Sequence, residues 1–90
     1  MKTKIYNAYS DPGHAWVKVS RSELIKLGID KDITPYSYQR KDKVYLEEDC
    51  DLSTFVKAME NKGIQVKFRE FVARTKSSKI RSYNNYVSGV

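Results

Sequence analysis

The sequence predicts an α+β fold, with one mainly antiparallel sheet of about five strands, two helices packed on one face and a short basic C-terminal segment. Segments in which apolar residues occupy every second position indicate strands, and they alternate with two segments of helical spacing. Each predicted helix ends at a Gly–Ile pair and is followed by another predicted strand. Both helices are therefore expected to return the chain to one sheet within a single domain, residues 1–90.

A tight turn is expected between the first two strands. Residues 4–10 are rich in aromatic and apolar side chains, and residues 14–20 alternate cleanly between two sets of side chains. Asp11, Pro12 and Gly13 lie between these segments. Pro presets φ at the first turn position, and Gly is expected to supply a positive φ at the second.

Capping signals bound the first predicted helix, residues 20–27. Ser20 and Glu23 form the S-x-x-E pattern of a capping box, which satisfies two free backbone amides at a helix start. Gly28 suits the position just after a helix, and Ile29 can make the hydrophobic contact beyond it.

Three further strands and the second helix complete the predicted domain. Residues 36–40 and 43–47 read as two strands, and residues 64–73 as the last one. Asp51 is the expected N-cap of a helix over residues 52–62. One apolar stripe follows this helix at i, i+3, i+4 and i+7: Leu52, Phe55, Val56 and Met59.

Alternation divides the strand residues into two faces. One set is expected to meet the helices: Val17, Val19, Val44, Leu46, Ile64, Val66 and Phe68. The other set combines aromatic and charged side chains: His14, Trp16, Lys18, Tyr45, Glu47, Lys67 and Arg69. Periodicity does not assign Tyr36, Tyr38 and Arg40 to a face. Because two helices with narrow apolar stripes cover one side of a sheet, the second set is expected on an uncovered face.

The net charge of +6 is concentrated in the last third of the chain. Residues 1–63 hold eleven Lys and Arg against ten Asp and Glu, whereas residues 64–90 hold six against one. Such asymmetry indicates an anionic partner. No apolar run reaches the roughly 20 residues needed to span a bilayer, so no membrane partner is expected. The single cysteine, Cys50, excludes an internal disulfide and points to the cytoplasm.

Aromatic and basic side chains together suggest a surface for nucleotides or nucleic acid, because rings stack on bases and cations meet phosphates. The base-stacking candidates are Trp16, Tyr36, Tyr38 and Tyr45. The phosphate-binding candidates are Lys67, Arg69, Lys76, Ser77, Ser78, Lys79 and Arg81, with His14 and Arg40 as secondary contacts. Two alternatives stay open: cross-strand pairs of these residue types stabilise sheets without any ligand, and the same face could be an interface between two copies of the chain.

Catalysis is the weakest function class. The single histidine, His14, has no evident nucleophile beside it. The acidic residues 47–51 are more simply a carboxylate-rich helix start than a metal site, and zinc would need more Cys and His than the chain contains. Cys50 at the helix entrance is expected to have a somewhat lowered thiol pKa. No catalytic residue, metal or cofactor is therefore expected.

Five segments in this order resemble small accessory proteins encoded by bacteriophages and plasmids: SDPGHAW (10–16), PYSYQR (35–40), YLEEDCD (45–51), KFREF (67–71) and SSKIRSY (77–83). The resemblance covers most of the chain and implies a context, a bacterial host cytoplasm. Small accessory phage proteins frequently counter host defence, by blocking a nuclease complex or by sequestering a nucleotide signal.

These observations lead to a functional hypothesis. We expect a non-enzymatic binding protein of a phage or mobile element that binds a nucleotide or another phosphate-bearing ligand on its aromatic and basic surface. Sequestering a host immune nucleotide would be an anti-defence activity. The alternatives are a protein–protein inhibitor of a host defence complex and a small nucleic-acid-binding protein, and a homo-oligomer is compatible with each.

Overall fold

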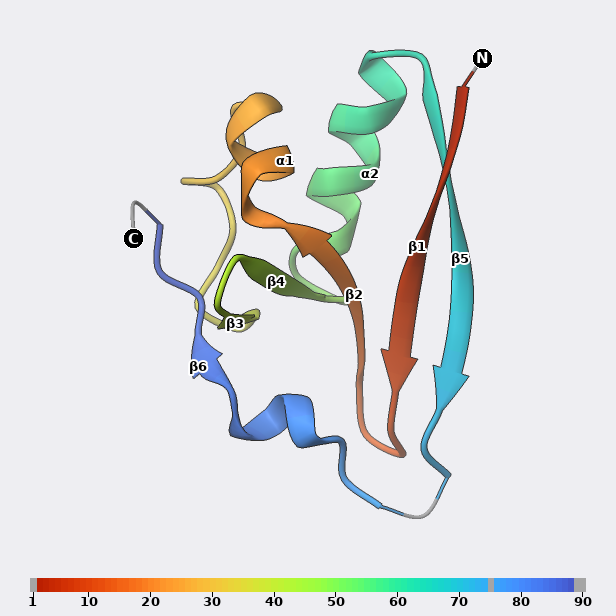
Figure 1. Ribbon diagram of the computed structural model, residues 1–90, viewed down its shortest axis with the longest axis vertical. Coiled ribbons are helices and arrows are strands. Elements are labelled where there is room, and N and C mark those ends of the chain that lie inside the picture. The colour runs from red at the N-terminus through yellow and green to blue at the C-terminus, as the bar shows by residue number, and fades with distance from the viewer. Residues whose placement is uncertain (1, 75, 89–90) are drawn as a thin grey trace.

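The computed structural model describes residues 2–74 and 76–88 and confirms the α+β class (Figure 1). Its sheet has six strands in the order β5-β1-β2-β4-β3-β6. The strands are β1 (Lys2–Ser10), β2 (Ala15–Ser20), β3 (Tyr38–Arg40), β4 (Lys43–Glu47), β5 (Ile64–Val72) and β6 (Asn84–Asn85). The helices are α1 (Arg21–Lys26), α2 (Leu52–Asn61) and the short 3-10 helix η1 (Lys79–Ser82). Neighbouring strands are antiparallel except β1 and β5, which are parallel.

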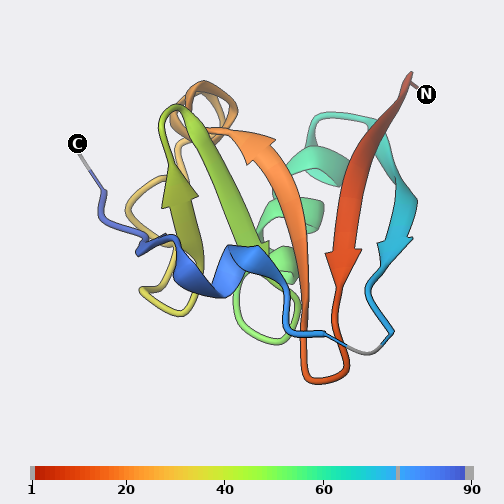
Figure 2. The same ribbon diagram turned by 60° about the horizontal axis from the view of Figure 1, so that its bottom comes forward.

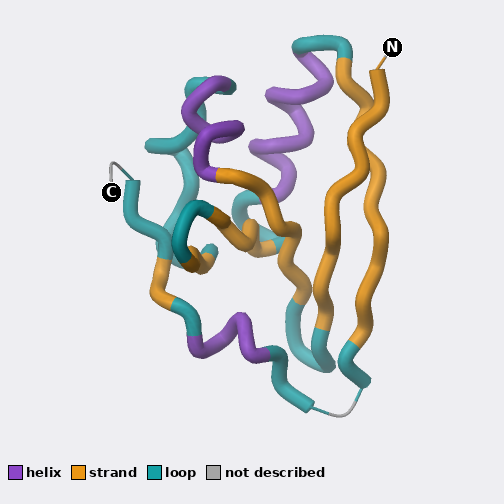
Figure 3. Tube along the Cα trace, viewed as in Figure 1, coloured by secondary structure: helices purple, strands orange, loops and turns teal. Residues whose placement is uncertain are grey.

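The sixth strand comes from the basic C-terminal segment, which the sequence reading left without a strand. β6 pairs with β3 at the edge of the sheet, through Tyr38 with Asn85 and Gln39 with Asn84. Figure 3 shows this segment passing through η1 and then running beside the sheet. The segment is therefore part of the fold and not a free end.

The expected capping of α1 is confirmed. The Ser20 hydroxyl accepts from the Glu23 amide at 3.2 Å, and the Ser20 amide donates to Glu23 Oε1 at 3.0 Å. Gly28 follows the helix with φ +73°, a left-handed conformation that Gly adopts without steric cost. The amide of Ile29, which is buried, then donates to the Leu24 carbonyl at 3.0 Å.

The turn before β2 forms, but for another reason than expected. The Asp11 carboxylate accepts from the amides of Gly13 and His14 at 2.9 and 3.0 Å. Among the described glycines only Gly28 and Gly63 have positive φ, so the positive φ expected at Gly13 is wrong. Gly13 instead allows a close approach, since a Cβ there would lie 2.7 Å from Nη2 of Arg81.

Asp51 is the N-cap residue of α2, as expected, but its side chain makes no capping hydrogen bond. Its buried carboxylate accepts from the Thr34 amide at 3.0 Å, from the Thr34 hydroxyl at 2.8 Å and from the Ser37 hydroxyl. These bonds tie the loop before β3 to the start of α2. They also hold residues 35–37 in a turn, so β3 begins at Tyr38, two residues later than expected.

The main core lies between the two helices and one face of the sheet. Its buried residues are Tyr6, Val17, Val19, Leu24, Ile29, Ile33, Val44, Leu46, Phe55, Met59 and Tyr86. The predicted helix-facing residues of β2 and β4 are all among them, and Ile64 and Val66 of β5 pack against the cluster. Phe68 is the exception, because it lies further along β5 and is 41% exposed.

The opposite face of the sheet is only partly uncovered. Figure 2 shows the C-terminal segment, in blue, crossing the sheet on the side away from the helices. A second cluster forms beneath it: Trp16, Tyr45 and Ile80 are buried, and Tyr9, Tyr38 and Tyr83 pack around them. Neither α1 nor α2, nor any other helix of the described residues, has the length and apolar character of a membrane span.

Candidate functional site

Strand register identifies the side chains that share the face away from the helices. Tyr9 pairs with Trp16, and Lys18 pairs with Tyr45, so these four residues point to one side. Tyr38 also pairs with Tyr45, and Arg40 pairs with Lys43, the partner of Ser20 on β2. Tyr38 and Arg40 therefore belong to this face, which periodicity alone left open.

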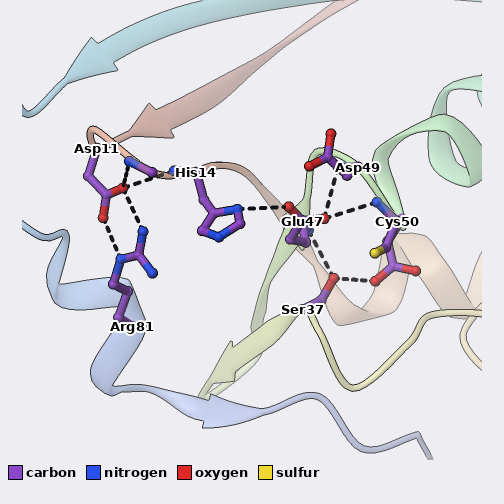
Figure 4. Close-up of polar contacts among 9 residues, drawn as sticks. Asp11, His14, Ser37, Glu47, Asp49, Cys50 and Arg81 are labelled. Carbon is purple, nitrogen blue, oxygen red and sulfur yellow. Dashed lines mark hydrogen bonds and ion pairs between the residues drawn. The ribbon is translucent and has the colours of Figure 1, made fainter.

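An ion pair between exposed Arg81 and buried Asp11 fastens the C-terminal segment to the turn before β2 (Figure 4). Arg81 donates from Nε to Asp11 Oδ2 at 2.6 Å and from Nη2 to Asp11 Oδ1 at 2.8 Å. The Ser78 amide donates to the same carboxylate at 2.8 Å. The Arg81 guanidinium and the backbone amides of Ser78, Gly13 and His14 hold the pKa of Asp11 well below its usual range. Arg81, predicted to bind phosphate, thus binds a carboxylate of its own chain.

The other predicted phosphate ligands of this segment have different surroundings. Ser78 is the N-cap of η1, and its hydroxyl accepts from the Ile80 amide at 3.2 Å, so it is engaged within its own segment. Lys79 is exposed on η1. Lys76 and Ser77 are exposed in the connection before it, and no hydrogen bond joins their side chains to another described residue.

Trp16 does not lie on an open surface, so the prediction that it stacks on a base there is wrong. The indole is 1% exposed, and its neighbours are Tyr38, at a ring-centroid distance of 6.1 Å, and the Arg81 guanidinium, 5.3 Å from its centroid. Tyr38 is half-buried. Tyr36 is 70% exposed, but it lies in the turn before β3 and not on the strand.

A groove of about 220 Å³ remains between the sheet and the C-terminal segment. It is lined by Tyr9, Lys18, Arg40, Tyr45, Ser78, Lys79, Ile80 and Tyr83. The rings of Tyr45 and Tyr83 are 5.2 Å apart between centroids, and the Arg40 guanidinium lies 5.4 Å from the centroid of Tyr83. Burial and the neighbouring phenols of Tyr83 and Tyr9 raise the pKa of Tyr45, so its hydroxyl stays protonated at neutral pH.

The groove unites four predicted residues with four that the site prediction omitted, of which Ile80 is a buried core residue. Tyr45, Arg40, Ser78 and Lys79 were site candidates, whereas Tyr9, Lys18 and Tyr83 were not. The sequence contained part of the information needed to find them, because alternation places Lys18 on the same face as Tyr45. Tyr83 reaches the groove only because the C-terminal segment folds back over the sheet, a contact that local patterns do not encode.

Lys67 and Arg69 lie on the same face but outside the groove. They pair in register with Ile5 and Asn7 of β1, and Phe71, two residues further along β5, stacks on Tyr9 with a centroid distance of 5.3 Å. Both cations are exposed on the edge strand. They extend the basic surface beyond the groove.

His14 lies at the other end of this face, beside the acidic residues that follow β4. Its Nδ1 is 3.4 Å from Oε1 of Glu47, while Glu47 Oε2 accepts from the amides of Asp49 and Cys50 at 2.8 and 3.0 Å. Desolvation and the Glu47 carboxylate raise the pKa of the Cys50 thiol. The lowered pKa expected for Cys50 is therefore wrong, because desolvation and the neighbouring carboxylates both favour the protonated thiol.

No protein-family model, curated protein or solved structure matches the chain.

Proposed function

We propose that the protein binds a nucleotide, or a closely related phosphate-bearing aromatic ligand, in the groove between its sheet and its C-terminal segment. One observation carries the proposal: Lys18, Arg40 and Lys79 line the groove, and none of the described residues that line it is a carboxylate. None of the three cations forms an ion pair with a described residue. Like charges gathered around one hollow without a counter-charge favour an anion there.

The side chains of the groove divide into two chemical roles. Lys18, Arg40 and Lys79 supply positive charge for a phosphate, and charge-assisted hydrogen bonds of this kind each contribute about 1.5–3 kcal/mol. Tyr83 and Tyr9 supply half-buried rings against which a base can pack. The volume of about 220 Å³ is small for a complete nucleotide site, so the groove would hold a phosphate and one ring, and the rest of the ligand would reach solvent.

No step of this proposal needs a reaction, so the function remains a non-enzymatic binding activity. The resemblance to accessory proteins of phages and plasmids supports a role in sequestering a nucleotide signal of host defence. A ligand that is bound but not converted would be unavailable to its receptor. The amount of ligand withheld would rise with the amount of this protein.

Short single-stranded nucleic acid is a second candidate, favoured by the cations beyond the groove. Lys67 and Arg69 of β5 and Lys43 of β4 share the face that carries Lys18 and Arg40. Adjacent strands are about 4.8 Å apart, so these positions cross the sheet over a distance that matches several nucleotides. A single strand would use this whole row, whereas a compact nucleotide would use the groove alone.

Calorimetric titration with mononucleotides, cyclic dinucleotides and oligothymidylates tests both candidates. The double substitution Lys18→Ala/Lys79→Ala should weaken binding at least tenfold, because it removes two charge-assisted contacts. Lys57→Ala is the matched control, since Lys57 is an exposed lysine of α2 on the other side of the sheet.

Ligand length and salt separate the two candidates. Single-stranded binding should strengthen with oligonucleotide length and weaken steeply with salt, with a log–log slope of about −0.7 per phosphate contacted. Binding of a mononucleotide as tight as that of a 10-mer would favour the groove alone. If no nucleotide or oligonucleotide binds at ligand concentrations up to about 1 mM, the proposal fails and the protein–protein inhibitor becomes the better explanation.

A further inference from the structure

Three side chains with metal-binding atoms meet outside the groove. His14 follows the turn before β2, Glu47 ends β4, and Asp49 lies in the turn after it. One ligand atom from each residue lies within 4.8 Å of those of the other two. Figure 4 shows the imidazole of His14 pointing at Glu47, with Asp49 beside it.

The Glu47 carboxylate supplies an independent sign of a missing ligand. Glu47 is only 6% exposed, and its Oε1 is buried without a hydrogen-bond partner among the described residues. Leaving a buried carboxylate oxygen unpaired is costly. This oxygen points at Nδ1 of His14, 3.4 Å away, without forming a hydrogen bond to it. When Nε2 carries the imidazole proton, Nδ1 and Oε1 both offer lone pairs toward the same space, which a cation can occupy.

The distance between these two atoms suits a shared metal ion. Ligand atoms about 2.0–2.1 Å from a tetrahedral Zn²⁺ lie about 3.3 Å from each other. His14 Nδ1 and Glu47 Oε1 are 3.4 Å apart, so the pair needs almost no movement. Asp49 is exposed, so its side chain can rotate to complete the set.

Hydrogen bonds hold the two less mobile ligands in place. Glu47 Oε2 accepts from the amides of Asp49 and Cys50, and the Glu47 amide donates to the Ser37 hydroxyl at 2.9 Å. The His14 amide donates to the Asp11 carboxylate at 3.0 Å. Such outer contacts orient metal ligands and raise metal affinity.

We propose that His14, Glu47 and Asp49 form a binding site for a divalent transition-metal ion of the Zn²⁺ class. One imidazole nitrogen and two carboxylate oxygens suit Zn²⁺ and related ions, whereas Ca²⁺ and Mg²⁺ prefer oxygen ligands alone. Three protein ligands leave a coordination position open toward the adjoining cleft of about 200 Å³. The count of Cys and His in the sequence could not indicate this site, because two of its three ligands are carboxylates.

Titration of the full chain with ZnCl₂ by calorimetry tests the proposal. One Zn²⁺ should bind per chain near pH 7. Co²⁺ provides a second readout. Trp16 is the only tryptophan, and its ring centroid lies 6.1 Å from that of His14, so bound Co²⁺ should quench its fluorescence.

Matched variants separate this site from nonspecific binding. His14→Ala and Asp49→Asn should each weaken Zn²⁺ binding about tenfold or more and abolish the Co²⁺ quenching. Glu48→Gln changes an exposed carboxylate outside the cluster, and Cys50→Ser removes the single thiol; both should stay within about twofold of wild type. Circular dichroism checks that each variant is folded.

Two results would overturn the proposal. One is Zn²⁺ binding by the wild type no tighter than about 1 mM, which would leave His14 and Glu47 as an ordinary contact within the protein. The other is unchanged affinity in His14→Ala together with a loss in Cys50→Ser, which would assign the binding to an isolated thiol.

Discussion

Ile80 is the residue through which the C-terminal segment enters the second core cluster, and Ile80→Ala tests whether that segment is a structural part of the domain. The side chain is 3% exposed and packs in the cluster with Trp16 and Tyr45. The same segment supplies Ser78, Lys79 and Tyr83 to the groove. Its docking therefore matters to both stability and the proposed function.

The expected cost follows from the atoms removed. Ile→Ala deletes three carbon groups, and each buried methylene contributes about 0.8 kcal/mol, which gives about 2.4 kcal/mol. The cavity left among the rings adds to this, so the free energy of unfolding should fall by about 3 kcal/mol. A chain of this size has roughly 5–13 kcal/mol in total, so the loss is a large fraction.

Urea unfolding followed by Trp16 fluorescence measures the effect. With a urea m-value of about 1–3 kcal/mol/M, Ile80→Ala should lower the unfolding midpoint by about 1–3 M. Emission of the folded variant should shift to longer wavelength, because a loosened segment exposes the indole to water. Ile25→Ala is the control: Ile25 is 56% exposed on α1, and its truncation should change stability by less than about 0.5 kcal/mol.

The reasoning fails if Ile80→Ala unfolds within about 0.5 kcal/mol of wild type and keeps the same folded emission spectrum. That outcome would mean that the segment does not shield Trp16 in solution. Ligand affinity would then also be independent of the segment.

Three further substitutions test the polar contacts. Because the pKa of Asp11 is lowered in the folded state, its ionised carboxylate stabilises the fold. This contribution is fully present above about pH 4 and is lost as pH falls. The urea midpoint of Asp11→Asn should therefore depend less on pH between about 5 and 2 than the midpoint of the wild type. Gly13→Ala should lower the melting temperature, because the new Cβ displaces the guanidinium paired with Asp11; an unchanged value would contradict the close approach. Tyr6 donates to Glu23 at 2.5 Å, so Tyr6→Phe should cost about 1.5 kcal/mol in urea unfolding, while Tyr36→Phe, at an exposed site, should cost nothing measurable.

Local signals predicted the elements well. The capping box of Ser20 and Glu23 and the left-handed Gly28 act within a few residues, and both are present as expected. Alternation sorted Val17 and Val19 correctly onto the helix side. In each case the deciding interaction lies within one turn or one strand, so the pattern contains the necessary information.

The site could be predicted only in part, because its decisive contacts join distant segments. Arg81 and Asp11 are 70 residues apart, and their pairing changes a predicted phosphate ligand into a structural link. The same fold-back buries Trp16 and brings Tyr83 to the groove. Charge asymmetry pointed to the cations of the last third, such as Lys79, but not to Lys18 and Arg40, and it could not show which cations already have partners.

The sequence therefore established the α+β class, the order and approximate bounds of the helices and main strands, and the basic character of the last third. These properties depend on periodicity, capping and composition, which are local or additive. Only the tertiary structure decided three further features: the path of the C-terminal segment across the sheet, the pairing of Arg81 with Asp11, and the contact of His14 with Glu47. Each requires one segment to find another across the sheet, and the free energy of such contacts comes from joint burial, which no single stretch of sequence contains.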